Sequence, residues 1–113
     1  MSVSHITTHV LDTTLGKPAA GVAVGLEELS GAEWQPLASG TTDAQGRVKD
    51  LGPELLPSGT YRLRFDTGAY FAGIGTEAFF PEVSLTFTLD AAQEHYHVPL
   101  LLSPFAFSTY RGS

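Results

Sequence analysis

Apolar and polar residues alternate along short stretches of this chain, and Gly, Pro, Ser and Asp cluster between the stretches. A period of two is typical of β-strands that bury one face. We therefore predict strands over residues 6–12, 22–29, 33–42, 47–51, 60–66 and 83–89, with turns at 13–18 and 43–46. One short helix is predicted over residues 67–75, with Thr67 as its N-cap. About eight short strands separated by turn residues indicate an all-β sandwich.

The last nineteen residues predict a β-hairpin that turns at Ser103-Pro104. In its first strand Tyr96 and every second residue after it face the core, and His97 shares the opposite face with Pro99 and Leu101. A turn centred on Pro104 and Phe105 pairs residues whose numbers sum to 209. The predicted partners are Leu101 with Ser108, Pro99 with Tyr110, and His97 with Gly112.

The histidine-bearing faces of two predicted strands also carry apolar residues. Leu11 shares the face of His9, while Pro99 and Leu101 share the face of His97. The opposite faces are already apolar enough to form the core. An apolar patch left facing water usually marks an interface or a ligand groove. We therefore expect a partner on this face, and a second copy of the chain is the simplest one.

Length and charge limit the function classes. At 113 residues we expect one domain covering residues 1–113. The formal net charge of −6 disfavours nucleic acid and anionic membrane surfaces as partners. The chain has no cysteine, which excludes a disulfide framework and a thiol nucleophile. The amino terminus does not resemble a signal peptide, so we expect a cytoplasmic protein.

The candidate chemistry rests on few residues. A single histidine on a strand is more often an ordinary packed or surface residue than a catalyst. His9 and His97 stand out because each lies among apolar residues on a face that needs covering. His95 and His97 share a face, so a metal site is an alternative, but no third ligand has suitable spacing. Arg47, which follows a glycine turn, is either a solvated charge or an anion-binding group.

Five segments together resemble the 5-hydroxyisourate hydrolase family of transthyretin-like proteins, which acts in purine breakdown. They are residues 7–13, 16–19, 43–47, 95–104 and the terminal Ser108-Thr109-Tyr110-Arg111-Gly112-Ser113. They cover nearly the whole chain in the family's order. The ending Tyr-Arg-Gly-Ser is the most specific, because it separates the hydrolases from the hormone-carrying transthyretins.

The resemblance implies a transthyretin-like β-sandwich of two four-stranded sheets with one short helix. It also implies a homotetramer, a dimer of dimers, with active sites in the channel between the dimers. The reaction would be hydrolysis of 5-hydroxyisourate to 2-oxo-4-hydroxy-4-carboxy-5-ureidoimidazoline, without metal or cofactor. His9, Arg47 and His97 would be the catalytic residues. Which histidine is the base stays open.

The resemblance further implies a set of substrate-binding residues: His9, Arg47, Leu101, Ser108, Tyr110, Arg111, Gly112 and Ser113. The chain departs from the common family pattern at Phe105, Ala106 and Phe107, where Tyr, Gly and Tyr are usual. We expect Phe105 and Phe107 to pack in the core, so that the lost hydroxyls affect packing alone. The alternative function is a non-catalytic, transthyretin-like carrier that uses the same channel.

Overall fold

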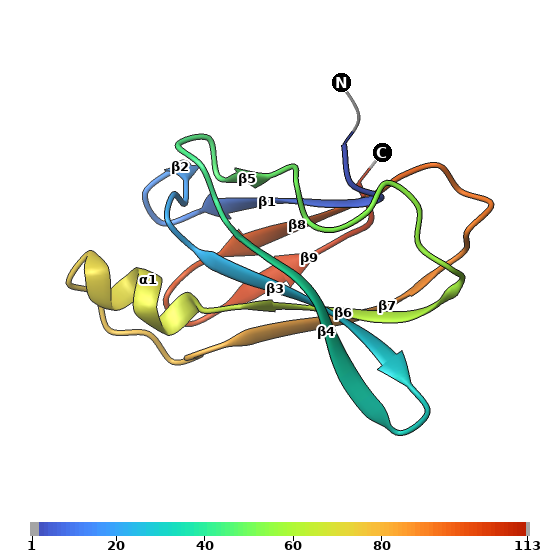
Figure 1. The fold of residues 1–113 in the computed structure, drawn as a ribbon. Coiled ribbons are helices and arrows are strands. Elements are labelled where there is room, and N and C mark those ends of the chain that lie inside the picture. Colours follow the sequence, from blue (N-terminus) through green and yellow to red (C-terminus); the bar gives the residue numbers. More distant parts are fainter. Residues whose placement is uncertain (1–2, 113) are drawn as a thin grey trace.

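The computed structural model describes residues 3–112, which form two β-sheets stacked face to face with one short helix at one end (Figure 1). This arrangement confirms the predicted all-β sandwich. The elements are β1 (Ile6–Asp12), β2 (Lys17–Pro18), β3 (Ala23–Ser30), β4 (Glu33–Thr41), β5 (Arg47–Val48), β6 (Gly59–Phe65), α1 (Thr67–Gly73), β7 (Val83–Leu89), β8 (Tyr96–Leu102) and β9 (Phe107–Thr109). In this part of the chain no helix is long and apolar enough to cross a bilayer.

The prediction of four strands in each sheet is right for one sheet and wrong for the other. The first sheet has the order β4-β3-β6-β7, and the second has five strands, β2-β1-β8-β9 with β5 also paired to β1. Because β8 occupies one edge of β1 along its full length, β2 and β5 share the other edge in succession. Each has only two residues, too few for a periodic pattern. Residues 13–18, predicted as a turn, therefore contain β2, and the strand predicted over 47–51 ends at Val48.

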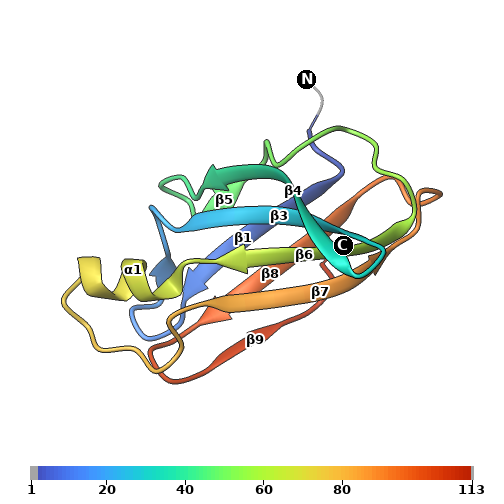
Figure 2. The ribbon, with the colours of Figure 1, turned by 60° about the horizontal axis from the view of Figure 1, so that its bottom comes forward.

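The central pairing of the second sheet joins β1 to β8, which run parallel and lie side by side in both views (Figures 1 and 2). Their register pairs Thr7 with His97 and His9 with Pro99. Beyond β8 the terminal hairpin has the predicted register, because Leu101 pairs with Ser108 and His97 with Gly112. The start of β1 and the tail of the chain consequently lie at the same end of this sheet.

The core lies between the sheets and consists of the alternating inward residues that the pattern predicts. On β8 these are Tyr96, Val98, Leu100 and Leu102, all buried. Phe105 and Phe107, which we expected in the core, are 66% and 38% exposed. They are outside because β9 is an edge strand that begins only at Phe107. The Phe107 ring instead meets the Phe80 ring edge-on, with centroids 5.2 Å apart.

The N-cap of helix α1 lies one residue earlier than predicted. Asp66, not Thr67, is the N-cap, and its side chain accepts a hydrogen bond from the Ala69 amide. Thr67 is buried, and its hydroxyl donates to the Phe80 carbonyl at 2.8 Å. Asp and Thr both cap helices well, so the choice depends on this tertiary contact.

Gly46 holds the turn that leads into β5, and it is the first position we would test. Its φ is +77°, and a Cβ there would lie 2.3 Å from the Val10 carbonyl oxygen. Gly46→Ala should therefore add a backbone collision to the strain of a left-handed residue, which by itself costs about 1–2 kcal/mol. Gly21→Ala is the matched control, because φ is +82° there and a Cβ meets nothing within 4 Å.

Urea unfolding of the two variants measures the difference. We expect Gly46→Ala to lose more free energy of unfolding than Gly21→Ala, by roughly 1 kcal/mol or more. Equal losses would show that the contact between Gly46 and the β1 backbone is unimportant.

Candidate functional site

The outer face of the five-stranded sheet gathers three of the four histidines. Parallel pairing of β1 with β8 brings His9 and His97 together, with ring centroids 6.5 Å apart and planes tilted by 37°. The Thr7 hydroxyl lies 2.9 Å from His97 Nδ1 and 2.9 Å from His95 Nε2. His5 is not part of this group. It is buried, bonds the Gln93 carbonyl through Nε2, and accepts from the Leu56 amide at Nδ1.

Arg47 joins the histidine face through β5, whose register sets it opposite His9. The turn before it is fixed by Asp43, whose carboxylate accepts hydrogen bonds from the Gln45 and Arg47 amides. These two hydrogen bonds lower the pKa of Asp43, and the bond from the Arg47 amide has the larger effect. His9 Nε2 donates to the Gln45 carbonyl at 2.8 Å. This bond leaves Nδ1 as the acceptor nitrogen of a neutral His9 ring.

The pKa of His97 is lowered from its usual value, chiefly because the ring is partly buried. Positive charge on Arg47, His9 and His95 lowers it further. A histidine with a depressed pKa is neutral at pH 7, and a neutral imidazole can accept a proton. A histidine with a lowered pKa binds fewer protons in the folded state than in the unfolded state. Its contribution to the free energy of unfolding is therefore present above about pH 6.5 and is lost as the pH falls below that value.

A hollow of about 270 Å³ opens beside these residues. Its lining residues are Val3, Thr7, Thr8, Arg47, Lys49, His95 and His97. None of them is acidic, and two are permanently cationic. The hollow therefore suits a small ligand with anionic or carbonyl oxygens. Lys49 and Thr7 were missed from sequence, although alternation puts Lys49 two residues from Arg47 and Thr7 two from His9.

The terminal segment meets the histidine face at one residue. Gly112 pairs with His97, and its amide donates to the His97 carbonyl at 2.8 Å. Arg111 alternates to the opposite side, where its guanidinium lies 4.5 Å from the centre of the Tyr96 ring. Tyr110 is 59% exposed and lines a hollow with Arg111 and Tyr96. The fold thus brings Gly112, but not Arg111, to the histidines. Ser113 lies outside the described residues.

The apolar residues of the histidine face are only partly exposed to solvent. Leu11 and Leu101 are register partners, and both are half-buried. Pro99 is buried within the single chain, so the expectation that it faces water is wrong. Ser108, the hairpin partner of Leu101, is exposed. Leu11, Leu101 and Ser108 therefore form the part of this face that a ligand or another subunit can still cover.

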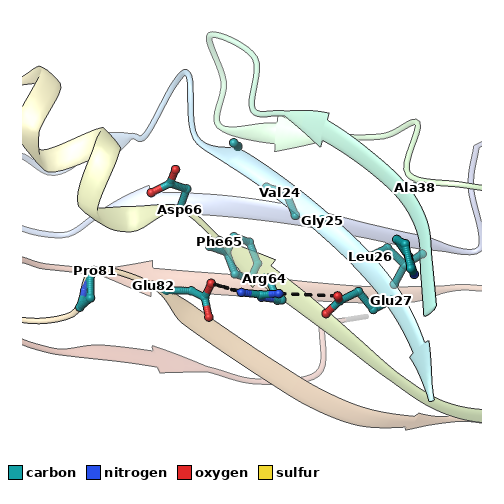
Figure 3. A pocket seen from close by; sticks show the side chains of 12 residues that line it. Val24, Gly25, Leu26, Glu27, Ala38, Arg64, Phe65, Asp66, Pro81 and Glu82 are labelled. Atoms are coloured by element: carbon teal, nitrogen blue, oxygen red, sulfur yellow. Dashed lines mark hydrogen bonds and ion pairs between the residues drawn. The ribbon is translucent and has the colours of Figure 1, made fainter. Parts of the chain in front are cut away.

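Neither of the other arrangements of polar groups competes with the histidine face. Among residues 3–112 no three His, Asp or Glu side chains are placed to hold a metal ion. A larger hollow, about 460 Å³, lies on the outer face of the other sheet and contains a charged row (Figure 3). There Arg64 is ion-paired to both Glu82 and Glu27. The bond from Arg64 lowers the pKa of Glu82, so these charges neutralise one another.

Comparison with known proteins gives a consistent result. Residues 6–112 match the model of the HIUase/Transthyretin family. The 5-hydroxyisourate hydrolase of Salmonella dublin is 48% identical over 109 residues, covering 96% of this chain and 80% of that protein. The structure of Klebsiella pneumoniae 5-hydroxyisourate hydrolase has a TM-score of 0.86 and 40% identity, covering 97% and 100% of the two chains. Sea bream transthyretin in complex with thyroxine has a TM-score of 0.91 and 33% identity, covering 96% and 94%.

The contact between Gly112 and His97 can be tested by substituting Gly112. A Cβ at Gly112 would lie 2.7 Å from His97 Cδ2, so Gly112→Ala should displace the tail from the ring. Because burial is the main cause of the low pKa of His97, its pKa should rise toward 6.5. Proton NMR titration of the histidine rings measures this value.

Gly25→Ala is the control, since a Cβ there meets nothing within 4 Å. It should leave the titration of His97 unchanged. If Gly112→Ala also leaves it unchanged, the tail does not shield the ring.

Proposed function

This chain belongs to the HIUase/transthyretin family, and we propose that it hydrolyses 5-hydroxyisourate to 2-oxo-4-hydroxy-4-carboxy-5-ureidoimidazoline in urate degradation. The observation that carries the proposal is the meeting of His9, Arg47 and His97 on one face. The choice of substrate is supported by relatives at 43–48% identity that are named 5-hydroxyisourate hydrolase. We further propose that residues 1–113 act as one domain and that the enzyme works in the cytoplasm.

His97 is the group we assign as general base. Its Nδ1 is occupied by the Thr7 hydroxyl, which leaves Nε2 for the substrate side. Neutral Nε2 accepts a proton as a water molecule attacks the ring amide carbonyl. The carbon–nitrogen bond of the ring then breaks, and the departing nitrogen takes a proton. The product is a carboxylate, because the water oxygen stays on the carbon.

Arg47 is the group we assign to the negative charge that forms on the carbonyl oxygen. A guanidinium is a cation that presents several donors in a fixed plane. Donors of this kind are worth roughly 3–4 kcal/mol each when they are already in position. The cationic lining of the hollow around Arg47 supports this role.

His9 is held by the bond from Nε2 to the Gln45 carbonyl, which supports a role in binding the substrate through Nδ1. Leu101 and Ser108 adjoin this face, and Gly112 contacts His97, so we include them among the substrate contacts. For Tyr110, Arg111 and Ser113 the proposed contact rests on their place in the terminal motif, not on proximity to the histidines.

We also propose a homotetramer built as a dimer of dimers. Three observations on residues 3–112 support association. Leu11 and Leu101 remain half-buried on the site face. β7 and β9 are edge strands of the two sheets, and such edges pair readily with another chain. Phe105 and Phe107, at the same edge as β9, expose aromatic surface.

A carrier is the second candidate, favoured by the likeness to sea bream transthyretin, whose structure was solved in complex with thyroxine. The iodinated aromatic rings of this ligand are best held by an apolar groove. The hollow here contains Arg47, Lys49, His95 and His97 instead. The polar lining therefore favours the hydrolase.

Decay of freshly prepared 5-hydroxyisourate, followed by ultraviolet absorbance, tests the function. The protein should accelerate it, and His97→Ala should lower turnover by about 10² or more, the usual contribution of a general base. His9→Ala should act similarly. Arg47→Lys keeps the charge but loses the planar fork, so it should cost one or more decades, each about 1.4 kcal/mol.

Arg64→Lys, on the opposite sheet, is the control for Arg47→Lys and should keep full turnover. No acceleration by the wild-type protein, together with tight thyroxine binding, would favour the carrier. Full turnover in both histidine variants would mean that the site is elsewhere.

Light scattering tests the assembly. We expect a mass about four times the 12.0 kDa of one chain at micromolar concentration. Leu11→Glu places a charge on the half-buried site face and should lower the mass, because burying an unpaired charge is costly. Leu55→Glu, on an exposed loop, should not. A wild-type mass of 12.0 kDa would contradict the tetramer.

A further inference from the structure

One hydroxyl group connects two of the site histidines. Thr7 Oγ1 lies 2.9 Å from His97 Nδ1 and 2.9 Å from His95 Nε2. Thr7 is only 7% exposed, whereas His95 is exposed to solvent. The register of β1 and β8 fixes the first contact, because Thr7 pairs directly with His97. The second follows because His95 precedes His97 by two residues and shares its face.

The hydroxyl has a single proton, and this limits how the two rings can be protonated. Thr7 can donate to only one of the two nitrogens and must accept from the other. If it donates to His95, then His97 carries its proton on Nδ1 and its Nε2 is free to accept one. If it donates to His97, then His97 Nε2 carries the proton. The tautomers of His95 and His97 are therefore coupled through Thr7.

We propose that Thr7 is a positioning residue that joins His97 to His95 as a proton relay during hydrolysis. The proposal rests on the function proposed above, with His97 as the base. Thr7 does not touch the substrate in this scheme. It holds His97 in the tautomer that accepts a proton, and it moves the resulting positive charge to His95 at the surface.

The relay conserves every proton. As water attacks, its proton goes to His97 Nε2, the Nδ1 proton moves to Thr7 Oγ1, and the hydroxyl proton moves to His95 Nε2. His97 is then neutral with its proton on Nε2, and His95 is a cation at the surface. As His97 passes the Nε2 proton to the departing ring nitrogen, the proton on His95 returns through Thr7 to His97 Nδ1, which restores the starting state.

The charges around His97 explain why a relay would help. Arg47 approaches from β5, His9 from β1 and His95 from the segment before β8, and Lys49 lines the same hollow. Among residues 3–112, none that lines this hollow is acidic. Within this described part of the chain the charged groups near half-buried His97 are Arg47, His9 and His95, consistent with the lowered pKa of that ring. A positive charge on exposed His95 is solvated by water.

Threonine suits the position better than a flexible residue would. Its branched side chain restricts rotation about χ1, so the hydroxyl stays between the two rings. Valine has nearly the same shape and favours strands, but it lacks the hydroxyl. Serine keeps the hydroxyl and loses the methyl group. These two substitutions therefore separate the relay from a purely structural role.

The experiment compares Thr7→Val and Thr7→Ser in the full-length protein. We expect Thr7→Val to lower kcat by about tenfold or more, a part of the usual contribution of proton transfer, with KM within about twofold of wild type. Thr7→Ser keeps the hydroxyl, so its kcat should stay within about threefold of the wild-type value. Added imidazole buffer should raise kcat of Thr7→Val and not that of wild type, because it can carry the stranded proton.

Thr67→Val is the control for loss of a buried hydroxyl, because Thr67 bonds the Phe80 carbonyl far from the site. It should lower the melting temperature without changing kcat. An unchanged kcat in Thr7→Val, or equal losses in Thr7→Val and Thr7→Ser, would overturn the relay while hydrolysis by the wild type stands.

Nitrogen-15 NMR of the histidine rings tests the chain of hydrogen bonds without using activity. In the wild type, titration of His95 should change the tautomer of His97, and Thr7→Val should abolish this coupling. Independent titration in the wild type would overturn the relay. A wild type that shows the coupling yet does not hydrolyse 5-hydroxyisourate would instead overturn the proposed function, and with it the catalytic use of the relay.

Discussion

The site depends on one pairing, the parallel ladder between β1 and β8. Seven consecutive residue pairs join these strands, from Ile6 with Tyr96 to Asp12 with Leu102. Side chains on paired strands that point the same way become neighbours, so the ladder sets His9 and Thr7 beside the face of His97. The inner face of the same ladder is buried core, with Ile6, Val10 and Leu100 fully covered. A slip by one residue would turn the histidines inward and the core outward. The packing energy of the core thus fixes the position of the site.

The remaining parts of the site are attached to this ladder by short elements. β5 has only two residues, but it sets Arg47 opposite His9, and the Asp43 and Gly46 turn holds it there. At the other edge the tail reaches His97 through Gly112, where a larger residue would collide with the ring. Both attachments are local turns or hairpins carried by a rigid sheet. Functional groups on such a scaffold are held with little loss of entropy when a ligand binds.

The electrostatic character of the site follows from the cationic lining of the hollow. Within residues 3–112 this lining contains Arg47 and Lys49 but no acidic residue, although the chain as a whole has twice as many acidic as basic residues. On the opposite sheet, by contrast, Arg64 is paired with Glu27 and Glu82 (Figure 3). Arg62 is also paired with Glu27. Paired charges stabilise a surface only modestly. Cations next to an imidazole attract an anionic ligand and disfavour protonation of the ring.

The sequence by itself determined whatever depends on neighbours along the chain. Alternation of apolar residues gave the bounds of β1 and β7, and the terminal hairpin gave the pairing of His97 with Gly112, because a tight turn fixes the register of its own strands. Resemblance of five segments to a known family added the predicted catalytic residues. Only the tertiary structure decided which distant strands pair. Periodicity shows which face a residue occupies but not which strand lies beside it, so Thr7 between two histidines could not be read from the chain. For the same reason Asp66 replaced Thr67 as the helix cap, Phe105 and Phe107 lay outside the core, and Arg111 packed on the Tyr96 ring.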